Sequence, residues 1–449
     1  MTDTARTLAI RILAVASVLV VNISCTVGPD YVRPSVAVPP AYKEAKDAKA
    51  GEPRSEIPRG RWWELFDDGA LNVLEAEVDV NNQTLRAAEA RVRQAQAMTD
   101  AAESRYSPML SIAGINLNLG LVASWEPDLW GRIRRTVEAS TATAEATADE
   151  LEAAKLSLQA QLAQNYFLLR VQDAEIRLLQ DHVARYERSL QLTRNQYAVG
   201  VVSRGDVVQA EAQLMSTRAQ ALEAEVARAQ FEHAIAVLIG KAPADFSIAP
   251  TPIEPRFPAV PLALPSELLE RRPDIAAAER RMAAANAQIG VAEAAFYPSI
   301  SLFAGGGFGN RDFEGGASYG WVLFDAGFRQ AQSAQATAVY DETLANYRQT
   351  ILAAFREVED SLAALRILEE EAAVQAMAVR AAGESVTIAN NQYRAGIVNY
   401  LAVVVVQAGA LNNERAALGI LGRRLVASLT LIKALGGGWE AEASKAAKK

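Results

Sequence analysis

Two stretches of the sequence carry a hydrophobic side chain at every seventh position. The first series is Leu162, Leu169, Ile176, Val183, Leu190 and Tyr197. The second keeps the same register with Val358, Leu365, Ala372, Val379, Val386 and Tyr393. A seven-residue apolar repeat is typical of the contact line of a coiled coil. Each stretch is rich in Ala, Leu, Glu, Gln and Arg and lacks proline, which predicts two helices of roughly 100 Å.

The two stretches belong to an internal duplication. Trp125 matches Trp321, Gly131 matches Gly327, and Tyr197 matches Tyr393, always with the same spacing along the chain. A fixed spacing over such a distance indicates two copies of one structural unit. We therefore expect the same elements, in the same order, in both halves of the chain.

A short turn follows each predicted long helix. Gly200 and Gly396 stand where a helix end favours the left-handed backbone conformation. Ser203 and Asn399 follow as predicted N-caps of returning helices, which we expect over residues 203–239 and 400–435. The chain should therefore form two antiparallel helical hairpins. A proline-rich stretch, 250–261, predicts an extended linker between the two repeats.

Strand candidates lie between the short and long helices of each half. From Ile115 to Trp125 apolar residues alternate with polar or small ones. This period suits a barrel wall with lipid on one side and water on the other, but it suits any half-buried strand hairpin equally well. Only 16 residues separate Pro108 from Trp125, and 22 separate Pro298 from Trp321, so the strands are predicted to be short.

Composition narrows the function classes. The 449 residues carry a net charge of -8, with no long basic run to meet nucleic-acid phosphates. One cysteine and two histidines, His182 and His233, cannot build a disulfide framework or a zinc cluster within one chain. No nucleophile or carboxylate motif accompanies the histidines. We expect no enzyme activity, no metal, no cofactor and no nucleic-acid partner.

The N-terminus reads as an export signal. Arg6 and Arg11 precede the apolar stretch Ile12–Val21, and Cys25 follows the small residue Ser24. Ile23-Ser24-Cys25 resembles the end of a bacterial lipoprotein signal, in which the cysteine becomes the lipidated first residue. Asn22 departs from that pattern, which usually has an aliphatic residue there. The alternative is a free buried thiol after a simple signal peptide.

Several longer motifs resemble one family. The stretch Leu264–Arg281 reads LPSELLERRPDIAAAERR and is followed by Tyr297-Pro-Ser-Ile-Ser-Leu. Cys25-Thr-Val-Gly-Pro-Asp-Tyr-Val-Arg-Pro, Trp62-Trp-Glu-Leu-Phe-Asp and Trp125-Glu-Pro-Asp-Leu-Trp-Gly-Arg fit the same pattern. Together they resemble the outer-membrane factors of resistance-nodulation-division efflux systems, in the TolC-like lipoprotein branch. The resemblance covers the chain from Cys25 to about Gly438.

The resemblance implies a passive channel that exports drugs or other small molecules. It implies a homotrimer with a twelve-stranded β-barrel in the outer membrane of a Gram-negative bacterium and a twelve-helix tunnel through the periplasm. It also implies a lipid anchor, a periplasmic adaptor (membrane fusion protein) and an inner-membrane pump. The alternative is a periplasmic coiled-coil structural or adaptor protein without a complete membrane-spanning barrel.

The resemblance also implies a gate at the periplasmic tips of the hairpins. Asp206 and Tyr393 match a carboxylate and a tyrosine that contact each other in the closed tip of relatives. Arg204, Arg394 and Tyr400 lie beside them, and the turn residues Gly200, Ser203, Gly396 and Asn399 match the adaptor-docking tips. Where relatives carry further charges, this chain has Val398, Ala402 and Val405, which would line an apolar throat. The alternative role for Asp206 is to cap the returning helix near Ser203.

The predicted fold is mainly α-helical with a small β part: two long coiled-coil hairpins and four short strands per chain. The boundaries that we expect are a signal peptide over 1–24, an extended lipid-anchored segment over 25–61, a first repeat over 62–245, a proline-rich linker over 246–265, a second repeat over 266–438 and a flexible tail over 439–449.

Overall fold

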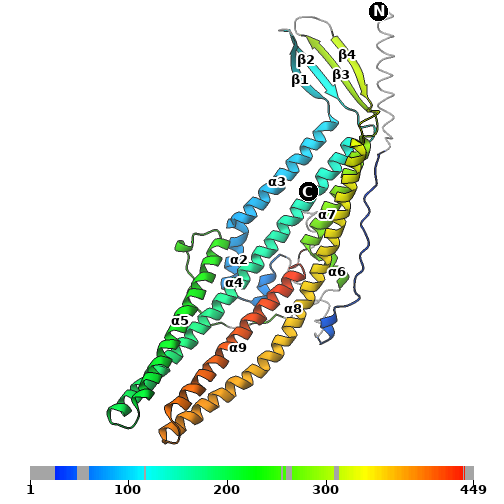
Figure 1. Ribbon diagram of the computed structural model, residues 1–449. Coiled ribbons are helices and arrows are strands. Elements are labelled where there is room, and N and C mark those ends of the chain that lie inside the picture. Colours follow the sequence, from blue (N-terminus) through cyan, green and yellow to red (C-terminus); the bar gives the residue numbers. More distant parts are fainter. Residues whose placement is uncertain are drawn as a thin grey trace, which may run out of the picture. The chain divides into compact units, whose positions relative to one another are not determined.

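The computed structural model describes residues 26–47, 60–115, 118–253, 256–258, 265–307, 313–437 and 439. These residues form mainly helices and one four-stranded sheet (Figure 1), which confirms the predicted fold class. They divide into two compact units. The first holds the described part of Met1–Ala37 with Ala87–Glu152 and Pro273–Leu352, and the second holds Val38–Arg86, Ala153–Arg272 and Ala353–Lys449. Each unit contains segments of both sequence repeats.

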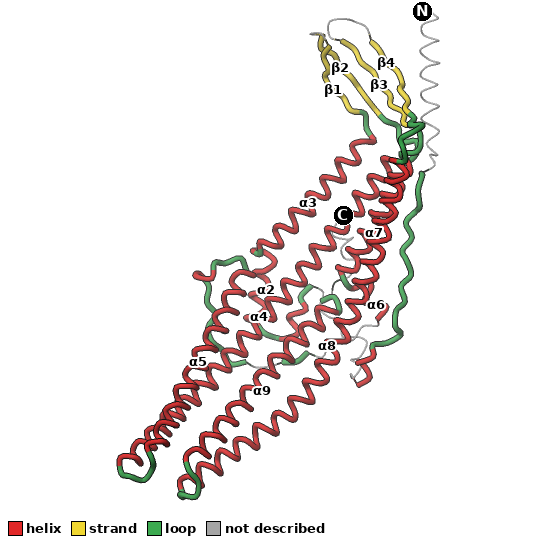
Figure 2. Tube along the Cα trace, viewed as in Figure 1, coloured by secondary structure: helices red, strands yellow, loops and turns green. Residues whose placement is uncertain are grey.

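The two long helices are present, and the return helices have the predicted bounds within one residue. The first hairpin consists of α4 (Arg132–Ala198) and α5 (Arg204–Leu238), and the second of α8 (Phe328–Arg394) and α9 (Tyr400–Ala434). Figure 2 shows the short turn that closes each hairpin. Both long helices contain 67 residues, as equal copies of a duplicated unit should.

Shorter helices precede the strands of each half. In the first half these are α2 (Gly69–Asn81) and α3 (Gln83–Glu103), and in the second α6 (Pro265–Arg271) and α7 (Pro273–Ala294). Brief 3-10 helices occur at Lys43–Asp47, Trp62–Phe66, Ser104–Tyr106 and Pro243–Asp245. Asn82 separates α2 from α3 because its side-chain oxygen accepts the backbone N–H groups of Thr84 and Leu85, which fixes a new helix start.

The sheet lies in the first unit. Its strands β1 (Met109–Ile115), β2 (Asn118–Trp125), β3 (Ser299–Gly307) and β4 (Phe313–Gly320) are antiparallel and pair in sequence order. The alternating pattern from Ile115 to Trp125 is therefore not one strand, because Ile115 ends β1 and β2 begins at Asn118. Periodicity alone did not show the chain reversal within the pattern.

An extended N-terminal segment, residues 26–33, is held against helices of the same unit by polar contacts. The Arg135 guanidinium donates to the carbonyl oxygens of Val27 and Gly28 and to the carboxylate of Asp30. The Tyr31 hydroxyl donates to Glu279 on α7 over 3.2 Å. At Gly28, where φ is +92°, a Cβ would collide with the Cα of Gly290, so this crossing requires glycine at position 28. A Cβ on Gly290 would instead meet the side chain of Arg135, 2.8 Å away.

The proline-rich linker begins in close contact with the first hairpin. A buried network joins Arg170, Asp173 and Arg228, with the Arg228 Nε 2.7 Å from the Asp173 carboxylate. These arginines also donate to the carbonyl oxygens of Ile248 and Ala249. The start of the linker is therefore fixed to α4 and α5, although its composition predicts only an extended spacer.

One carboxyl group in α2 is buried without a partner. Glu75 has no exposed surface, and neither of its side-chain oxygens forms a hydrogen bond to any described residue. Burial raises the pKa of Glu75 well above its usual range, and the nearby Asp79 carboxylate raises it further. The neutral acid is the form that fits this site.

The first prediction concerns pH and Glu75. Because the folded-state pKa of Glu75 is raised, the folded protein binds this proton more tightly than the unfolded chain does. The contribution of Glu75 to stability is therefore greatest below the ordinary carboxyl pKa and falls as the pH rises toward the raised value. Glu75→Gln should therefore raise the melting temperature in detergent at pH 7–8 and change it little near pH 4. Glu225→Gln, which removes an exposed carboxylate, is the control. Parallel melting curves for Glu75→Gln and wild type at all pH values would contradict the burial argument.

The second prediction concerns the crossing of residues 26–33 over α7. Gly28→Ala adds both a left-handed backbone penalty and a collision with Gly290, whereas Gly60→Ala at φ +72° adds only the penalty, since nothing lies near its Cβ. Gly28→Ala should melt at least about 2 °C lower than Gly60→Ala. Equal melting temperatures would show that the crossing contributes nothing.

Candidate functional site at the hairpin turns

The turn of the first hairpin is closed by a reciprocal cap. Gly200 has φ +76°, and α5 begins after Ser203, whose hydroxyl oxygen accepts the backbone N–H of Asp206 at 3.3 Å. The Asp206 carboxylate accepts the backbone N–H of Ser203 at 2.9 Å and its hydroxyl at 2.7 Å. Together these bonds form a capping box, which satisfies two backbone N–H donors and the Ser203 hydroxyl at the helix start. The Ser203 N-cap is confirmed.

The turn of the second hairpin is built in the same way but without a carboxylate. Gly396 has φ +72°, and the Asn399 side chain accepts the backbone N–H of Ala402 at 3.2 Å. The Asn399 N-cap is therefore confirmed. Because Ala402 cannot return a hydrogen bond, this turn has only half of the cap that fixes the first one.

Close to the turns the two hairpins pack on each other through one apolar cluster. Its buried members come from all four helices and include Tyr400, Val403 and Val404 at the start of α9. The remaining buried members are Tyr186, Leu190, Ala210, Leu214 and Ala389. The seventh-residue positions Val183, Leu190 and Tyr393 all contact this cluster, so the predicted contact line faces the other hairpin here.

Two tyrosines of the second hairpin hydrogen-bond to α4. The Tyr393 hydroxyl donates to the side-chain oxygen of Gln196 at 2.8 Å, and the hydroxyls of Tyr400 and Ser189 lie 3.0 Å apart. The two rings lie edge to face, 5.4 Å between centroids. Burial raises the pKa of both phenols, so they are neutral hydrogen-bonding groups at physiological pH.

The expected contact between Asp206 and Tyr393 is not formed in this chain. Asp206 is engaged in the capping box and Tyr393 in its bond to Gln196. The physical reason is local: a carboxylate three residues after an N-cap serine reaches two donors without crossing to another helix. The alternative role of Asp206 as a cap is therefore the one that the structure shows, while its charge still acts on Tyr393 by raising that residue's pKa.

Charged side chains join the hairpins further from the turns. His182 Nε2 lies 2.7 Å from the Glu414 carboxylate, and Arg415 donates to Glu175 at 2.8 Å and to Gln220 at 3.2 Å. All of these contacts connect α9 to α4 or α5. The sequence pattern did not identify these pairs, because nothing in it indicates which charged faces of separate helices meet.

The outer surface of the turns is apolar with basic flanks. Val199, Val201 and Ile397 are exposed, as are Arg204 and Arg394, which form no ion pair with any described residue. Val405 is exposed as well, while Val398 and Ala402 are half-buried. These three apolar side chains occupy the positions at which the family resemblance implies further charges in relatives.

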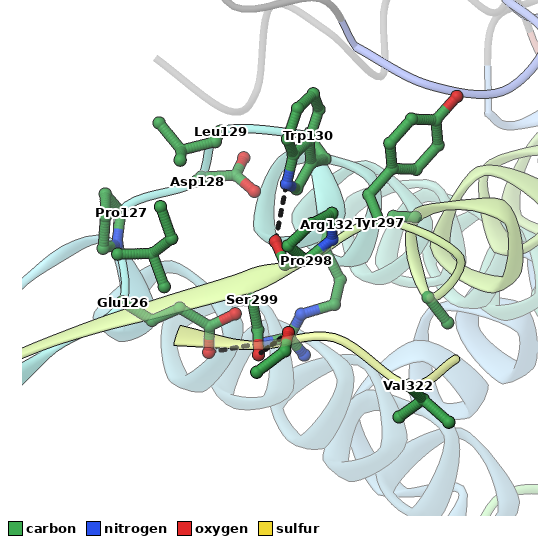
Figure 3. A pocket seen from close by; sticks show the side chains of 14 residues that line it. Glu126, Pro127, Asp128, Leu129, Trp130, Arg132, Tyr297, Pro298, Ser299 and Val322 are labelled. Carbon is green, nitrogen blue, oxygen red and sulfur yellow. Dashed lines mark hydrogen bonds and ion pairs between the residues drawn. The ribbon is translucent and has the colours of Figure 1, made fainter. Parts of the chain in front are cut away.

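A second concave feature lies at the base of the sheet in the first unit (Figure 3). The cavity has a volume of about 140 Å³ and lies between the loop after β2 and the segment before β3. The Trp130 indole donates to the carbonyl oxygen of Pro298 at 2.7 Å and stacks on Tyr297. An ion pair between Glu126 and Arg132 closes one wall. These contacts connect the two sequence repeats within one sheet.

In the described part of the chain no group of three or more His, Cys, Asp or Glu side chains is placed to hold a metal ion. Cys25, the predicted lipidation site, lies outside the described residues.

None of the helices in the described ranges is both long and apolar enough to cross a membrane.

The comparisons with known proteins agree with this geometry. The model of the family described as "Outer membrane efflux protein" matches residues 76–241 and 264–437. This chain belongs to the outer membrane efflux protein family. Its repeats correspond to the two matched ranges, and the gap between them contains most of the proline-rich linker.

Individual relatives support the assignment over nearly the whole chain. A probable efflux pump outer membrane protein, TtgC of Pseudomonas putida, is 31% identical and covers 94% of each chain. The probable outer membrane lipoprotein SilC of Salmonella typhimurium is 27% identical over 96% of this chain and 99% of that protein. The solved structure of the outer-membrane channel OprN has a TM-score of 0.85 at 31% identity, covering 92% of this chain and all of that chain.

The family gives the function of this outer membrane efflux protein. It is an outer-membrane channel component of a tripartite efflux pump and a transport protein, not an enzyme. Pump partners are implied by that role.

Proposed function

We propose that three copies of this chain assemble into a passive conduit, with the two hairpins of each copy lining the periplasmic end and the four strands of each copy completing a barrel in the outer membrane. The observation that carries the proposal is the packing of the two hairpins around Tyr400, Val403 and Val404. This cluster joins the two equivalent helical hairpins of one copy. Three copies would therefore supply a ring of six hairpins.

The hairpin turns are the proposed docking site for the adaptor. Val199, Val201 and Ile397 present apolar side chains to solvent, and Arg204 and Arg394 flank them. An exposed apolar surface with a charged rim is typical of a protein–protein interface. Gly200, Ser203, Gly396 and Asn399 shape these turns through their backbone geometry and caps.

The proposed gate consists of the hydrogen bonds that hold the second hairpin against α4 near the turns. Tyr393 to Gln196 and Tyr400 to Ser189 are the two bonds closest to the tip. When the tip opens, these bonds break and part of the apolar cluster separates. The half-buried Val398 and Ala402 and the exposed Val405 carry no charge, so the proposed constriction has no ring of carboxylates at these positions to select cations.

The cargo class follows from the same constriction. Valine and alanine at these positions do not select for cations as a ring of carboxylates would, so we propose small organic molecules of mixed polarity as cargo. The alternative of a coiled-coil structural protein that lacks a sheet does not account for the four paired strands or for the match to an outer-membrane channel.

The lipid anchor is proposed at Cys25. The relative SilC is named a probable outer membrane lipoprotein, and residues 26–33, which directly follow the cysteine, are fixed against α4 and α7. An acylated Cys25 would therefore be held at a defined place on the protein, where several acyl chains would add membrane affinity.

The gate is tested by Tyr393→Phe in planar bilayers. Loss of one hydrogen bond, worth about 1 kcal/mol, should shift the ratio of open to closed channels about fivefold toward open. Ser203→Ala is the matched control, because it disrupts the cap of the first turn and leaves the Tyr393 bond in place. If Tyr393→Phe leaves mean conductance unchanged, or if Ser203→Ala raises it equally, the gate does not depend on Tyr393.

The anchor is tested by the intact mass of the mature protein. Wild type should begin at Cys25 and carry acyl groups, Cys25→Ser should carry none, and Asn22→Leu should increase the lipidated fraction because it restores an aliphatic residue three positions before the cysteine. A mature wild-type chain with an unmodified Cys25 would refute the anchor and leave the channel role intact.

A further inference from the structure

The two hairpins differ in where their helices contain glycine. In the first hairpin, α4 and α5 contain glycine only at Gly205, in the first turn of α5. The second hairpin has glycine inside both helices, at Gly383 in α8 and at Gly409, Gly419 and Gly422 in α9. Glycine weakens a helix interior because its backbone can adopt other conformations more freely. The second hairpin is therefore the more easily bent of the two.

Packing does not require glycine at Gly383 or Gly409. A Cβ added at either position would meet no heavy atom within 4 Å apart from the backbone of its own helix turn. Gly422 is different, because a Cβ there would approach the side chains of Leu168 and Val171 on α4. Close helix packing thus accounts for Gly422. At the other two positions the missing side chain leaves the helix free to bend.

The carbonyl groups of these two glycines each accept a hydrogen bond from a side chain four residues later. The Thr387 hydroxyl donates to the carbonyl oxygen of Gly383 at 3.1 Å, and the Asn413 side-chain amide donates to that of Gly409 at 2.8 Å. Such a side chain competes with the backbone hydrogen bond of the helix and favours bending. Similar bonds occur elsewhere in the described helices, but there the acceptor is not a glycine.

The two glycines lie at nearly the same level of the hairpin. Measured along the helix axes, Gly383 is about 17 Å from the end of α8 at Arg394, and Gly409 is about 14 Å from the start of α9 at Tyr400. The two antiparallel helices therefore have their points of least resistance side by side, so that both can bend together.

The first hairpin is braced at the equivalent level. Glu187 of α4 forms an ion pair with Arg218 of α5, which joins the two helices of that hairpin. By the spacing of the repeat, the equivalent residues in the second hairpin are Gly383, which has no side chain to pair, and Glu414, which bonds to His182 of the first hairpin. The second hairpin thus lacks the ion pair that stiffens the first one here.

The polar contacts between the hairpins fall on two sides of the glycine level. Towards the turn, Tyr393 and Tyr400 bond to side chains of α4. Away from the turn, Glu414 and Arg415 bond to other side chains of α4. The contacts of Glu414 and Arg415 can therefore keep the main part of the second hairpin in place while the two tyrosine bonds break.

We propose that Gly383 and Gly409 form the hinge on which the end of the second hairpin, residues 384–408, swings when the tip opens. This inference rests on the proposed gate and adds the place where its helices bend. A hinge concentrates the change of backbone angles in a few residues. Glu414 and Arg415 hold the rest of the hairpin against α4, so the tip moves without displacing the whole length of the two helices.

Alanine at both hinge positions tests the proposal in the full-length protein. Gly383→Ala with Gly409→Ala stiffens both helices without a collision, so the melting temperature in detergent should not fall. The ratio of open to closed channels in planar bilayers should fall at least about threefold, in wild type and in the Tyr393→Phe background. Gly419→Ala is the matched control, because its Cβ also meets open space but it lies beyond Glu414 on α9. It should leave the ratio unchanged.

The outcomes separate the hinge from the gate. If the double variant lowers the ratio no more than Gly419→Ala does, the hinge is not at these positions. If Tyr393→Phe opens the channel and the double variant leaves that opening intact, the hinge is overturned and the gate stands. If Tyr393→Phe changes nothing while the double variant lowers the ratio, the hinge stands and the gate bond is wrong. Gly383→Ala and Gly409→Ala, measured singly, should each give part of the decrease and replace the double variant if it does not assemble.

Discussion

The burial of the first turns of α9 between the helices of the other hairpin is the contact on which the rest of the structure depends. Long helices whose apolar residues form only a narrow line cannot bury that line alone, and one hairpin leaves part of it open. Tyr400, Val403 and Val404 belong to a buried cluster that includes apolar residues of both hairpins. Apolar contacts are not directional. The position of one hairpin along the other is therefore set by polar contacts beside the cluster, which involve Tyr393 and Tyr400 near the turns and Glu414 and Arg415 further along.

In the proposed gate, this division of roles allows the tip to be closed and still movable. A cluster of small and branched side chains contributes free energy without fixing one arrangement, whereas a few hydrogen bonds of about 1 kcal/mol each choose among nearby arrangements. The two turns are also unequally capped. The first has a reciprocal cap through Ser203 and Asp206, and the second has only the Asn399 acceptor. The second hairpin therefore has the less firmly fixed end, and it is the one that the tyrosine bonds hold in place.

The duplication has a different consequence in the sheet. Within one chain the second repeat covers the loop after β2, so the indole of Trp130 finds an acceptor and the ring of Tyr297 a stacking partner. The second repeat has no third copy to cover its own loop, and Trp321–Phe324 stay exposed. If each repeat must be followed by another to cover its loop, two repeats in one chain are not enough. This is the physical basis of the proposed assembly into a ring.

The sequence by itself determined the two long helices, their turns, the N-caps Ser203 and Asn399 and the order of the elements. These features depend on neighbours in the chain, through the heptad period, the absence of proline and the local reach of a cap. The family resemblance was carried by long motifs and was confirmed by the match over both repeats. It did not decide what Asp206 does, because the same residue can reach either its own helix start or a tyrosine on another helix.

Only the tertiary structure decided which separate faces meet. It showed that Tyr393 bonds to Gln196 and not to Asp206, that His182 pairs with Glu414, and that the arginines Arg170 and Arg228 fix the start of the linker. It also placed the Glu75 carboxyl in a buried position of α2 where neither oxygen has a hydrogen-bond partner among the described residues. These contacts depend on how each helix is rotated about its own axis relative to its neighbour. A rotation that moved the contact line by one residue would leave the heptad pattern almost the same but would bring different polar side chains together.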